Sequence, residues 1–129
     1  MSTSLTALQL AVMRVLWRLG EATVVEVQEE LREERALAQT TVATLLSRLE
    51  KRGVVAYRTE GRQYVYRGQI TEEDVRGSVL AEVTDRLFHG DLTTLVSHLL
   101  ARAEVDAADL AKVRELIEAR ERELRERQR

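Results

Sequence analysis

A series of short hydroxyl side chains that ends in a lysine has the spacing of one side of a helix. Its members recur at intervals of three or four residues: Thr40, Thr44, Ser47 and Lys51. Most surface helices expose long charged side chains, whereas short hydroxyls allow a helix to enter the major groove of DNA and hydrogen-bond to base edges or phosphates. Arg48 flanks the series and adds a donor for guanine or phosphate. The pattern favours a nucleic-acid contact over an ordinary solvated face.

A second pair of candidate donors, Arg58 and Arg62, flanks the dipeptide Glu60-Gly61. The segments on either side, VVAYRT and RQYVYR, are rich in β-branched and aromatic residues, which predicts two strands joined by a hairpin turn at that dipeptide. Hairpin arginines are often only solubilising, but beside the hydroxyl series we favour a contact with a nucleic-acid backbone or minor groove. The three tyrosines of the strands are expected to pack across the hairpin.

Charge is distributed unevenly along the chain. The net charge of −2 would by itself argue against a polyanionic partner. Residues 38–68, however, hold six basic and two acidic side chains, a net charge of +4. Residues 69–129 hold ten basic and fourteen acidic side chains, a net charge of −4. The electropositive segment therefore coincides with the hydroxyl series and the hairpin.

Three helices are expected before the hairpin, and they must position these side chains. Capping and glycine signals predict that the helices cover residues 5–19, 23–34 and 39–52. The third carries the hydroxyl series, and its other side forms an apolar stripe: Val42, Leu45, Leu46 and Leu49. Three helices and a hairpin, here over residues 54–67, follow the order of a winged helix-turn-helix, in which the third helix enters the major groove. We predict such a domain over residues 1–69.

The remaining residues, 70–129, are expected to form three more helices that start near Thr71, Asp91 and Asp106. Apolar residues recur along them with helical spacing and exceed what three short helices can bury alone, so we predict pairing with a second copy of the chain. The residues expected at this dimer contact are Val79, Val83, Leu87, Leu92, Leu95, Val96, Leu99, Leu100, Val113 and Ile117. Arg120 interrupts the heptad pattern of the last helix, which argues against a long coiled coil. The predicted fold class is mainly α with a small β-hairpin wing, a winged helix-turn-helix domain followed by a three-helix dimerisation region.

Several classes of protein are disfavoured by what the sequence lacks. There is no cysteine, no apolar run of membrane-spanning length and no signal-peptide pattern, so a cytoplasmic protein is expected. The only histidines, His89 and His98, lack a second histidine at metal-binding helical spacing. No glycine-rich phosphate loop is present, and the many carboxylates lie on solvated helix faces. We therefore expect no enzymatic activity, no metal and no cofactor.

Six stretches of the chain, taken in order, resemble the penicillinase-repressor family of the BlaI/MecI type. They are LQLAVMRVLW, TVVEVQEEL, TTVATLLSRLEKRGVV, GRQYVYR, ITEEDV and LFHGDLTTLVSHLL. The resemblance implies a winged-helix domain, a C-terminal dimerisation region and repression by binding to a palindromic operator in double-stranded DNA. It also implies that the helix contacts are Thr40, Thr41, Thr44, Ser47, Arg48 and Lys51. The wing contacts would lie in the Arg58–Arg62 region.

The resemblance further implies a membrane-bound sensor protease as a partner, which inactivates such repressors by cleavage in the dimerisation region. The family often has an Asn-Phe step there, and this chain has His98-Leu99 instead. Some members carry an arginine where this chain has Ala43, which affects the expected operator sequence. Copper-sensing relatives use C-terminal cysteines, which this chain lacks.

The leading hypothesis is therefore a bacterial, cytoplasmic, homodimeric transcriptional repressor without membrane insertion. One alternative is a winged-helix module that binds other proteins and no DNA. Another is a regulator that senses a small molecule directly. Retention on heparin would discriminate the first alternative, because it depends on the electropositive segment.

Overall fold

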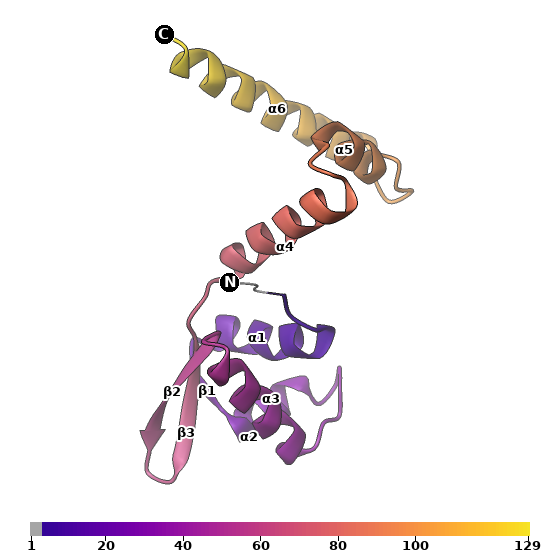
Figure 1. Ribbon diagram of the computed structural model, residues 1–129. Helices are drawn as coiled ribbons and strands as arrows, with labels where there is room; N and C mark the ends of the chain where they lie inside the picture. Colours follow the sequence, from indigo (N-terminus) through magenta and orange to yellow (C-terminus); the bar gives the residue numbers. More distant parts are fainter. Residues whose placement is uncertain (1–3) are drawn as a thin grey trace. The chain divides into compact units, whose positions relative to one another are not determined.

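The structure is a computed structural model that describes residues 4–129, so residues 1–3 of the predicted first domain lie outside it. The described chain is mostly helical, with one three-stranded antiparallel sheet (Figure 1). Its elements are α1 (Ala7–Leu19), β1 (Ala22–Thr23), α2 (Val24–Leu31), α3 (Gln39–Lys51), β2 (Val55–Glu60), β3 (Gln63–Gly68), α4 (Glu72–Leu87), α5 (Leu92–Leu100) and α6 (Ala107–Arg127). The predicted fold class is confirmed.

The chain divides into two compact units, one that reaches to Val83 and one from Thr84 to Arg129. This division falls inside α4, whereas the wing ends at Gly68. The expected domain boundary after residue 69 marks the end of the wing and stays a prediction. No helix in residues 4–129 combines the length and the apolar character that crossing a membrane requires.

Helices α1 and α2 of the N-terminal unit each begin with a capping box. Thr6 accepts a hydrogen bond from the backbone N–H of Gln9, and the Gln9 side chain accepts one from the N–H of Thr6. Thr23 and Glu26 form the same reciprocal pair at the start of α2. These pairs satisfy backbone donors that a helix start leaves open.

Helix α2 is shorter than the prediction, because it ends at Leu31 instead of residue 34. Continuation would place Glu33 one turn from Glu29, and Glu34 one turn from Glu30. Like charges at this spacing weaken a helix slightly, but α2 contains such a pair in Glu26 and Glu30, so this repulsion alone does not explain the earlier end.

The sheet has the order β1-β3-β2, and β1 was not predicted. Only two residues long, β1 pairs with Val65 and Tyr66 of β3. The hairpin turn also differs from the prediction by one residue: Glu60 pairs with Gln63, so the loop is Gly61-Arg62. Gly61 has φ 62°, the conformation that the first loop residue of a type II′ turn requires and that glycine adopts without strain.

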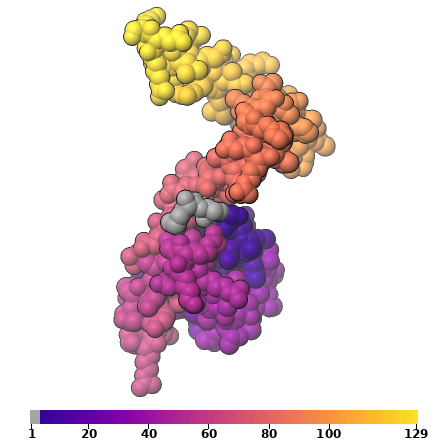
Figure 2. Space-filling view, viewed as in Figure 1, coloured from indigo at the N-terminus to yellow at the C-terminus, as the bar shows by residue number. Residues whose placement is uncertain are grey.

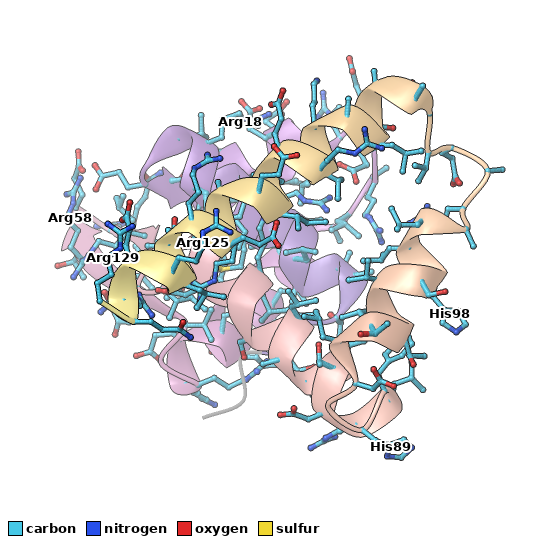
Figure 3. The ribbon with its side chains drawn as sticks, turned by 90° about the horizontal axis from the view of Figure 1, so that it is seen from above. Arg18, Arg58, His89, His98, Arg125 and Arg129 are labelled. Carbon is cyan, nitrogen blue, oxygen red and sulfur yellow. The ribbon has the colours of Figure 1, made fainter. Side chains whose placement is uncertain are left out.

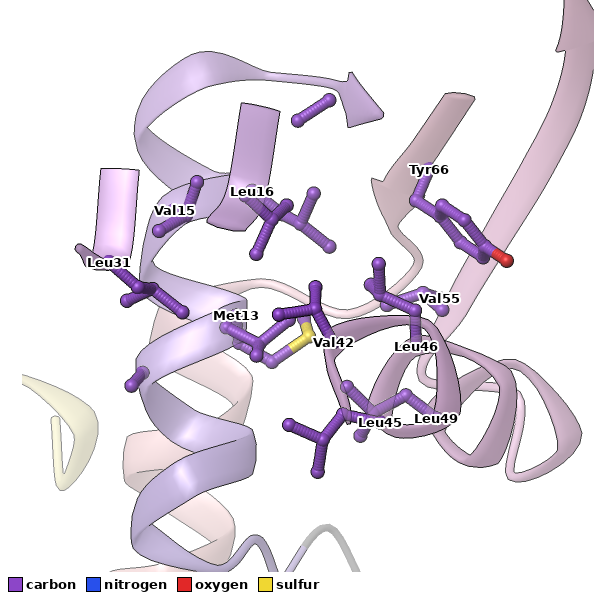
Figure 4. Packing of buried hydrophobic residues seen from close by; sticks show 14 of the residues in the cluster. Met13, Val15, Leu16, Leu31, Val42, Leu45, Leu46, Leu49, Val55 and Tyr66 are labelled. Carbon is purple, nitrogen blue, oxygen red and sulfur yellow. The ribbon is translucent and has the colours of Figure 1, made fainter. Parts of the chain in front are cut away.

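The N-terminal unit closes a hydrophobic core between its helices and the base of the sheet (Figure 4). The predicted stripe of α3 lies inside this core, as do Met13 and Leu16 of α1. Its buried members are Ala11, Val12, Met13, Val15, Leu16, Ala22, Val27, Leu31, Val42, Leu45, Leu46, Leu49, Val54, Val55 and Tyr66. Trp17 packs at its margin, and its indole N–H donates to the carbonyl of Ile70 over 2.9 Å. This bond ties the segment after the wing to α1.

The C-terminal unit contains α5 and α6, each opened by an aspartate. Asp91 accepts from the N–H of Thr94, and Asp106 forms a capping box with Asp109. Within this unit, Leu95 at 8% exposure is the one buried apolar side chain of the described residues. Large apolar side chains stay exposed on both helices and on the end of α4: Leu87, Leu92, Leu99, Leu100, Leu110, Leu116, Ile117 and Leu124.

Candidate nucleic-acid interface

Helix α3 has one buried and one exposed side, as the spacing of its residues predicts. The apolar stripe is buried in the core, so the opposite side is turned outward. All six predicted contact residues of this helix are exposed: Thr40, Thr41, Thr44, Ser47, Arg48 and Lys51. Ala43 beside them is half-buried. The helix therefore presents a surface of short hydroxyls with two cations toward its C-terminal end.

The hydroxyl of Thr44 already has a hydrogen-bond partner within α3. It donates to the backbone carbonyl of Thr40 over 2.9 Å. Its proton is thus used, while the lone pairs of its oxygen remain as acceptors on the exposed side. In the major groove the matching donors are the amino groups of adenine and cytosine.

The start of α3 differs from the other helix starts described above. Ala38 is its N-cap and provides no side-chain hydrogen bond. The first-turn amides of α3 lie beside the exposed residues Gln39, Thr40 and Thr41. Such open amides are compatible with a phosphate oxygen. An alanine where caps usually carry serine, threonine, aspartate or asparagine was the available sequence signal, and sequence reasoning missed it.

The two wing arginines predicted as contacts, Arg58 and Arg62, have different surroundings. Arg62 lies in the exposed loop at the hairpin tip, which projects from the N-terminal unit (Figure 2). Arg58 (Figure 3) is held by two carboxylates, with one nitrogen 2.8 Å from Glu21 and another 2.8 Å from Glu60. The hydrogen bond from Arg58 lowers the pKa of Glu21, and the two carboxylates raise the pKa of Arg58. Glu21 is a partner that sequence reasoning missed.

The three wing tyrosines pack together across the strands, as predicted. The ring centroids of Tyr57 and Tyr64 lie 4.2 Å apart in a stacked arrangement, and Tyr66 meets Tyr64 edge-on. Tyr66 is buried in the core, and this burial is the main cause that raises its pKa. Tyr57 and Tyr64 are 41% and 48% exposed. The aromatic row thus runs from the core toward the tip of the wing.

A hollow of about 290 Å³ lies between the wing and the starts of α2 and α3. Its polar lining consists of Thr23, Gln39, Arg62, Gln63 and Tyr64. Of these, only Arg62 was predicted as a site residue. Gln39 and Tyr64 escaped the sequence analysis because they belong to elements far apart along the chain.

The predicted dimer residues have mixed burial. Leu95 is buried, and three are half-buried: Val83, Val96 and Val113. The other six are exposed: Val79, Leu87, Leu92, Leu99, Leu100 and Ile117.

The histidines do not form a metal site with other described residues. No group of three or more histidine, aspartate or glutamate side chains in residues 4–129 has a metal-binding arrangement. His98 packs edge-on against Phe88, with ring centroids 5.4 Å apart. His89 and His98 both point outward from their ribbon (Figure 3).

The helix order, the wing and the exposed side of α3 define a winged helix-turn-helix protein of the DNA-binding class. The sequence model described as "Penicillinase repressor" matches residues 5–119, and the chain belongs to this family. It is a DNA-binding transcriptional repressor and not an enzyme. The family resemblance noted from the sequence is thereby confirmed.

Individual relatives agree with this assignment. The chain is 27% identical over 110 residues to the penicillinase repressor of Bacillus licheniformis, which covers 85% of this chain and 86% of that protein. It is 22% identical over 106 residues to the penicillinase repressor of Staphylococcus aureus, covering 82% and 84%. The solved DNA-binding domain of the repressor BlaI superposes with a TM-score of 0.52 at 32% identity, covering 57% of this chain and 90% of that structure.

Proposed function

We propose that the chain acts as a homodimer on a palindromic operator in double-stranded DNA, with α3 in the major groove and the wing on the flanking backbone. Occupancy of an operator that overlaps a promoter would block transcription. The exposed hydroxyl-and-lysine side of α3 is the observation that carries the proposal. The proposed site of action is the bacterial cytoplasm, where the DNA is.

The chemistry of α3 supports direct reading of bases. Thr44 and Ser47 are short enough to let the helix approach the base pairs, and both are exposed. Arg48 and Lys51 lie where their cations can reach guanine or phosphates. The further proposed contacts are Thr40, Thr41, Arg58 and Arg62. Arg58 would first have to exchange a carboxylate partner for a phosphate.

The exposed leucines of α5 and α6 support pairing of two chains. Soluble monomers rarely expose large contiguous apolar patches, and a second copy of the same surface would cover these side chains. The proposed contact comprises the ten residues predicted from the sequence. A two-fold dimer presents two α3 helices to DNA, and binding in successive major grooves about 34 Å apart requires a palindromic site.

We also propose that cleavage in the dimerisation region, by a membrane-bound sensor protease, would inactivate the repressor. The bond between His98 and Leu99 lies inside α5, and both residues are exposed. A protease needs an extended substrate, so α5 would have to unfold locally before cleavage. Separation of the dimer would then weaken binding, because each half-site contact alone is weak.

The experiment that tests the groove contact measures DNA binding over a salt series. We expect Lys51→Ala to weaken binding to all DNA and to reduce the salt-dependence slope by about one unit, because one phosphate contact is lost. Thr44→Val should instead change the preferred sequence, because its acceptor oxygen is replaced by a methyl group. The matched controls are Lys112→Ala and Thr93→Val, at exposed positions outside α3. Unchanged binding by both α3 variants would overturn the assigned surface.

The family membership bears differently on the two alternative functions, a protein-binding module and a small-molecule sensor. A module without DNA binding does not agree with the membership in a family of DNA-binding repressors. Direct sensing of a small molecule stays a hypothesis that no observation favours. It would be revived by a metabolite that raises the melting temperature of the chain.

A further inference from the structure

The hollow between the wing and the starts of α2 and α3 is lined by one charged side chain, which is positive. Arg62 provides a full positive charge, and the amides of Gln39 and Gln63 provide N–H donors. No carboxylate belongs to its lining, although the whole chain has a net charge of −2. Two valines at the start of α2 complete the wall. The chemistry of the hollow fits an anion.

The position of Tyr64 at this hollow is set by its neighbours. Its ring stacks on Tyr57 at 4.2 Å and meets the buried Tyr66 at 6.3 Å, so the aromatic row anchors it to the core. The phenolic O–H of Tyr64, which lines the hollow, can donate a hydrogen bond. A preorganised hydroxyl donor loses little conformational entropy on binding.

The location of the hollow identifies the anion. It lies between Gln39, at the start of the proposed groove-binding helix, and Arg62, at the tip of the wing. A helix in the major groove and a wing on the flanking backbone lie on either side of one stretch of sugar-phosphate strand. That strand must pass over this part of the surface.

We propose that one backbone phosphate of the bound duplex occupies this hollow, where Arg62, Gln39 and Tyr64 donate to its oxygens. The inference rests on the proposed function and adds Gln39 and Tyr64 as residues that set the register of the protein on DNA. Phosphate contacts of this kind fix orientation and carry no base preference.

Replacement of single phosphates by uncharged methylphosphonates tests whether a backbone phosphate occupies the hollow. The probe is a duplex that the wild-type chain selects from a random-sequence pool, prepared with one methylphosphonate at each backbone position in turn. For the wild type we expect one position in each half-site whose replacement weakens binding. In Arg62→Gln the same replacement should have little further effect, because the ion pair is already lost. Tyr64→Phe, which removes only the hydroxyl, should weaken binding roughly twofold to tenfold with unchanged base preference.

Arg67→Gln is the matched control, because Arg67 is an exposed wing arginine that does not line the hollow. This variant should keep the full sensitivity to the critical methylphosphonate. The melting temperature of Tyr64→Phe verifies that its wing is intact. One outcome would overturn the phosphate contact in the hollow and leave the proposed function intact: normal DNA binding by Arg62→Gln and Tyr64→Phe, together with weakened binding by Lys51→Ala. Failure of the wild type to select any duplex would overturn both.

Discussion

Leu46 and Leu116 are both leucines in helices of this chain, yet Leu46 is fully buried and Leu116 is 70% exposed. Leu46 lies in the N-terminal unit, where three helices and a sheet surround one core. Leu116 lies on α6, which has no buried residue. Both regions have apolar residues at helical spacing, so apolar content does not distinguish them. The difference is that one region has enough elements to cover its apolar sides and the other does not.

The comparison extends to the helix starts. In the N-terminal unit, hydroxyl side chains, Thr6 and Thr23, cap α1 and α2. In the C-terminal unit, carboxylates, Asp91 and Asp106, cap α5 and α6. The first unit encloses its own core, and the N-cap side chains of α1 and α2 are neutral hydroxyls. The second has an uncovered apolar surface, and the N-caps of α5 and α6 are carboxylates.

The largest effect is expected from a charge on the uncovered surface. Leu99→Asp should abolish self-association, because an unpaired carboxylate at a buried contact costs about 3–5 kcal/mol. This corresponds to a dimer dissociation constant raised at least about a hundredfold. Sedimentation equilibrium measures it directly. Ser97→Asp, at an exposed polar position of the same helix, is the matched control and should remain a dimer. A Leu99→Asp protein that still pairs would show that the C-terminal unit is covered in another way.

A leucine truncation in each region should separate the two kinds of stability. Leu46→Ala should lower the free energy of unfolding by about 2–5 kcal/mol at every protein concentration, because it leaves a cavity in a closed core. Leu116→Ala should have an effect that depends on protein concentration, if a second chain covers it. Urea titrations at two concentrations, followed by the fluorescence of Trp17 and by circular dichroism, measure both. Equal concentration dependence for the two variants would contradict the contrast.

A smaller effect is expected where the wing meets the rest of the N-terminal unit. Glu21→Gln removes one of the two carboxylates that hold Arg58, so Arg58 is bound only by Glu60 and the local negative charge falls. DNA binding should strengthen roughly twofold to threefold at low salt and become equal to wild type at high salt. Glu29→Gln, on the exposed side of α2, is the control. Weaker binding by Glu21→Gln would instead indicate that the ion pair orients the wing.

The smallest effect is expected from acid. The hydroxyl and backbone N–H of Thr94 lower the pKa of Asp91 below its ordinary value of 3.8. A lowered pKa in the folded state stabilises α5 above pH 3.8, and this contribution is lost as the pH falls through the folded-state value. Hydrogen exchange should therefore show α5 loosening before α1 as the pH falls below about 3.8. Asp91→Asn keeps a capping side chain that does not titrate and should remove this pH dependence.

The sequence alone was sufficient for features that depend on neighbouring residues. Capping pairs, such as Thr6 with Gln9, involve residues three apart, and the two sides of α3 follow from helical periodicity. The order of three helices and a hairpin then predicted the winged helix. The exposed side of α3 was predicted in full for the same reason, because burial of Val42 and Leu46 determines where Thr44 and Ser47 lie.

Features that join distant segments were decided only by the tertiary structure. Arg58 meets Glu21 across 37 positions of sequence, the two-residue strand β1 exists only because β3 is beside it, and the hollow joins Gln39 to Tyr64. No local sequence pattern encodes such contacts, because they depend on how helices and strands pack against one another. The spacing of residues within a single helix or strand does not determine them. The C-terminal helices follow the same rule. The spacing of their apolar residues was predictable from the sequence, but what covers those residues depends on packing.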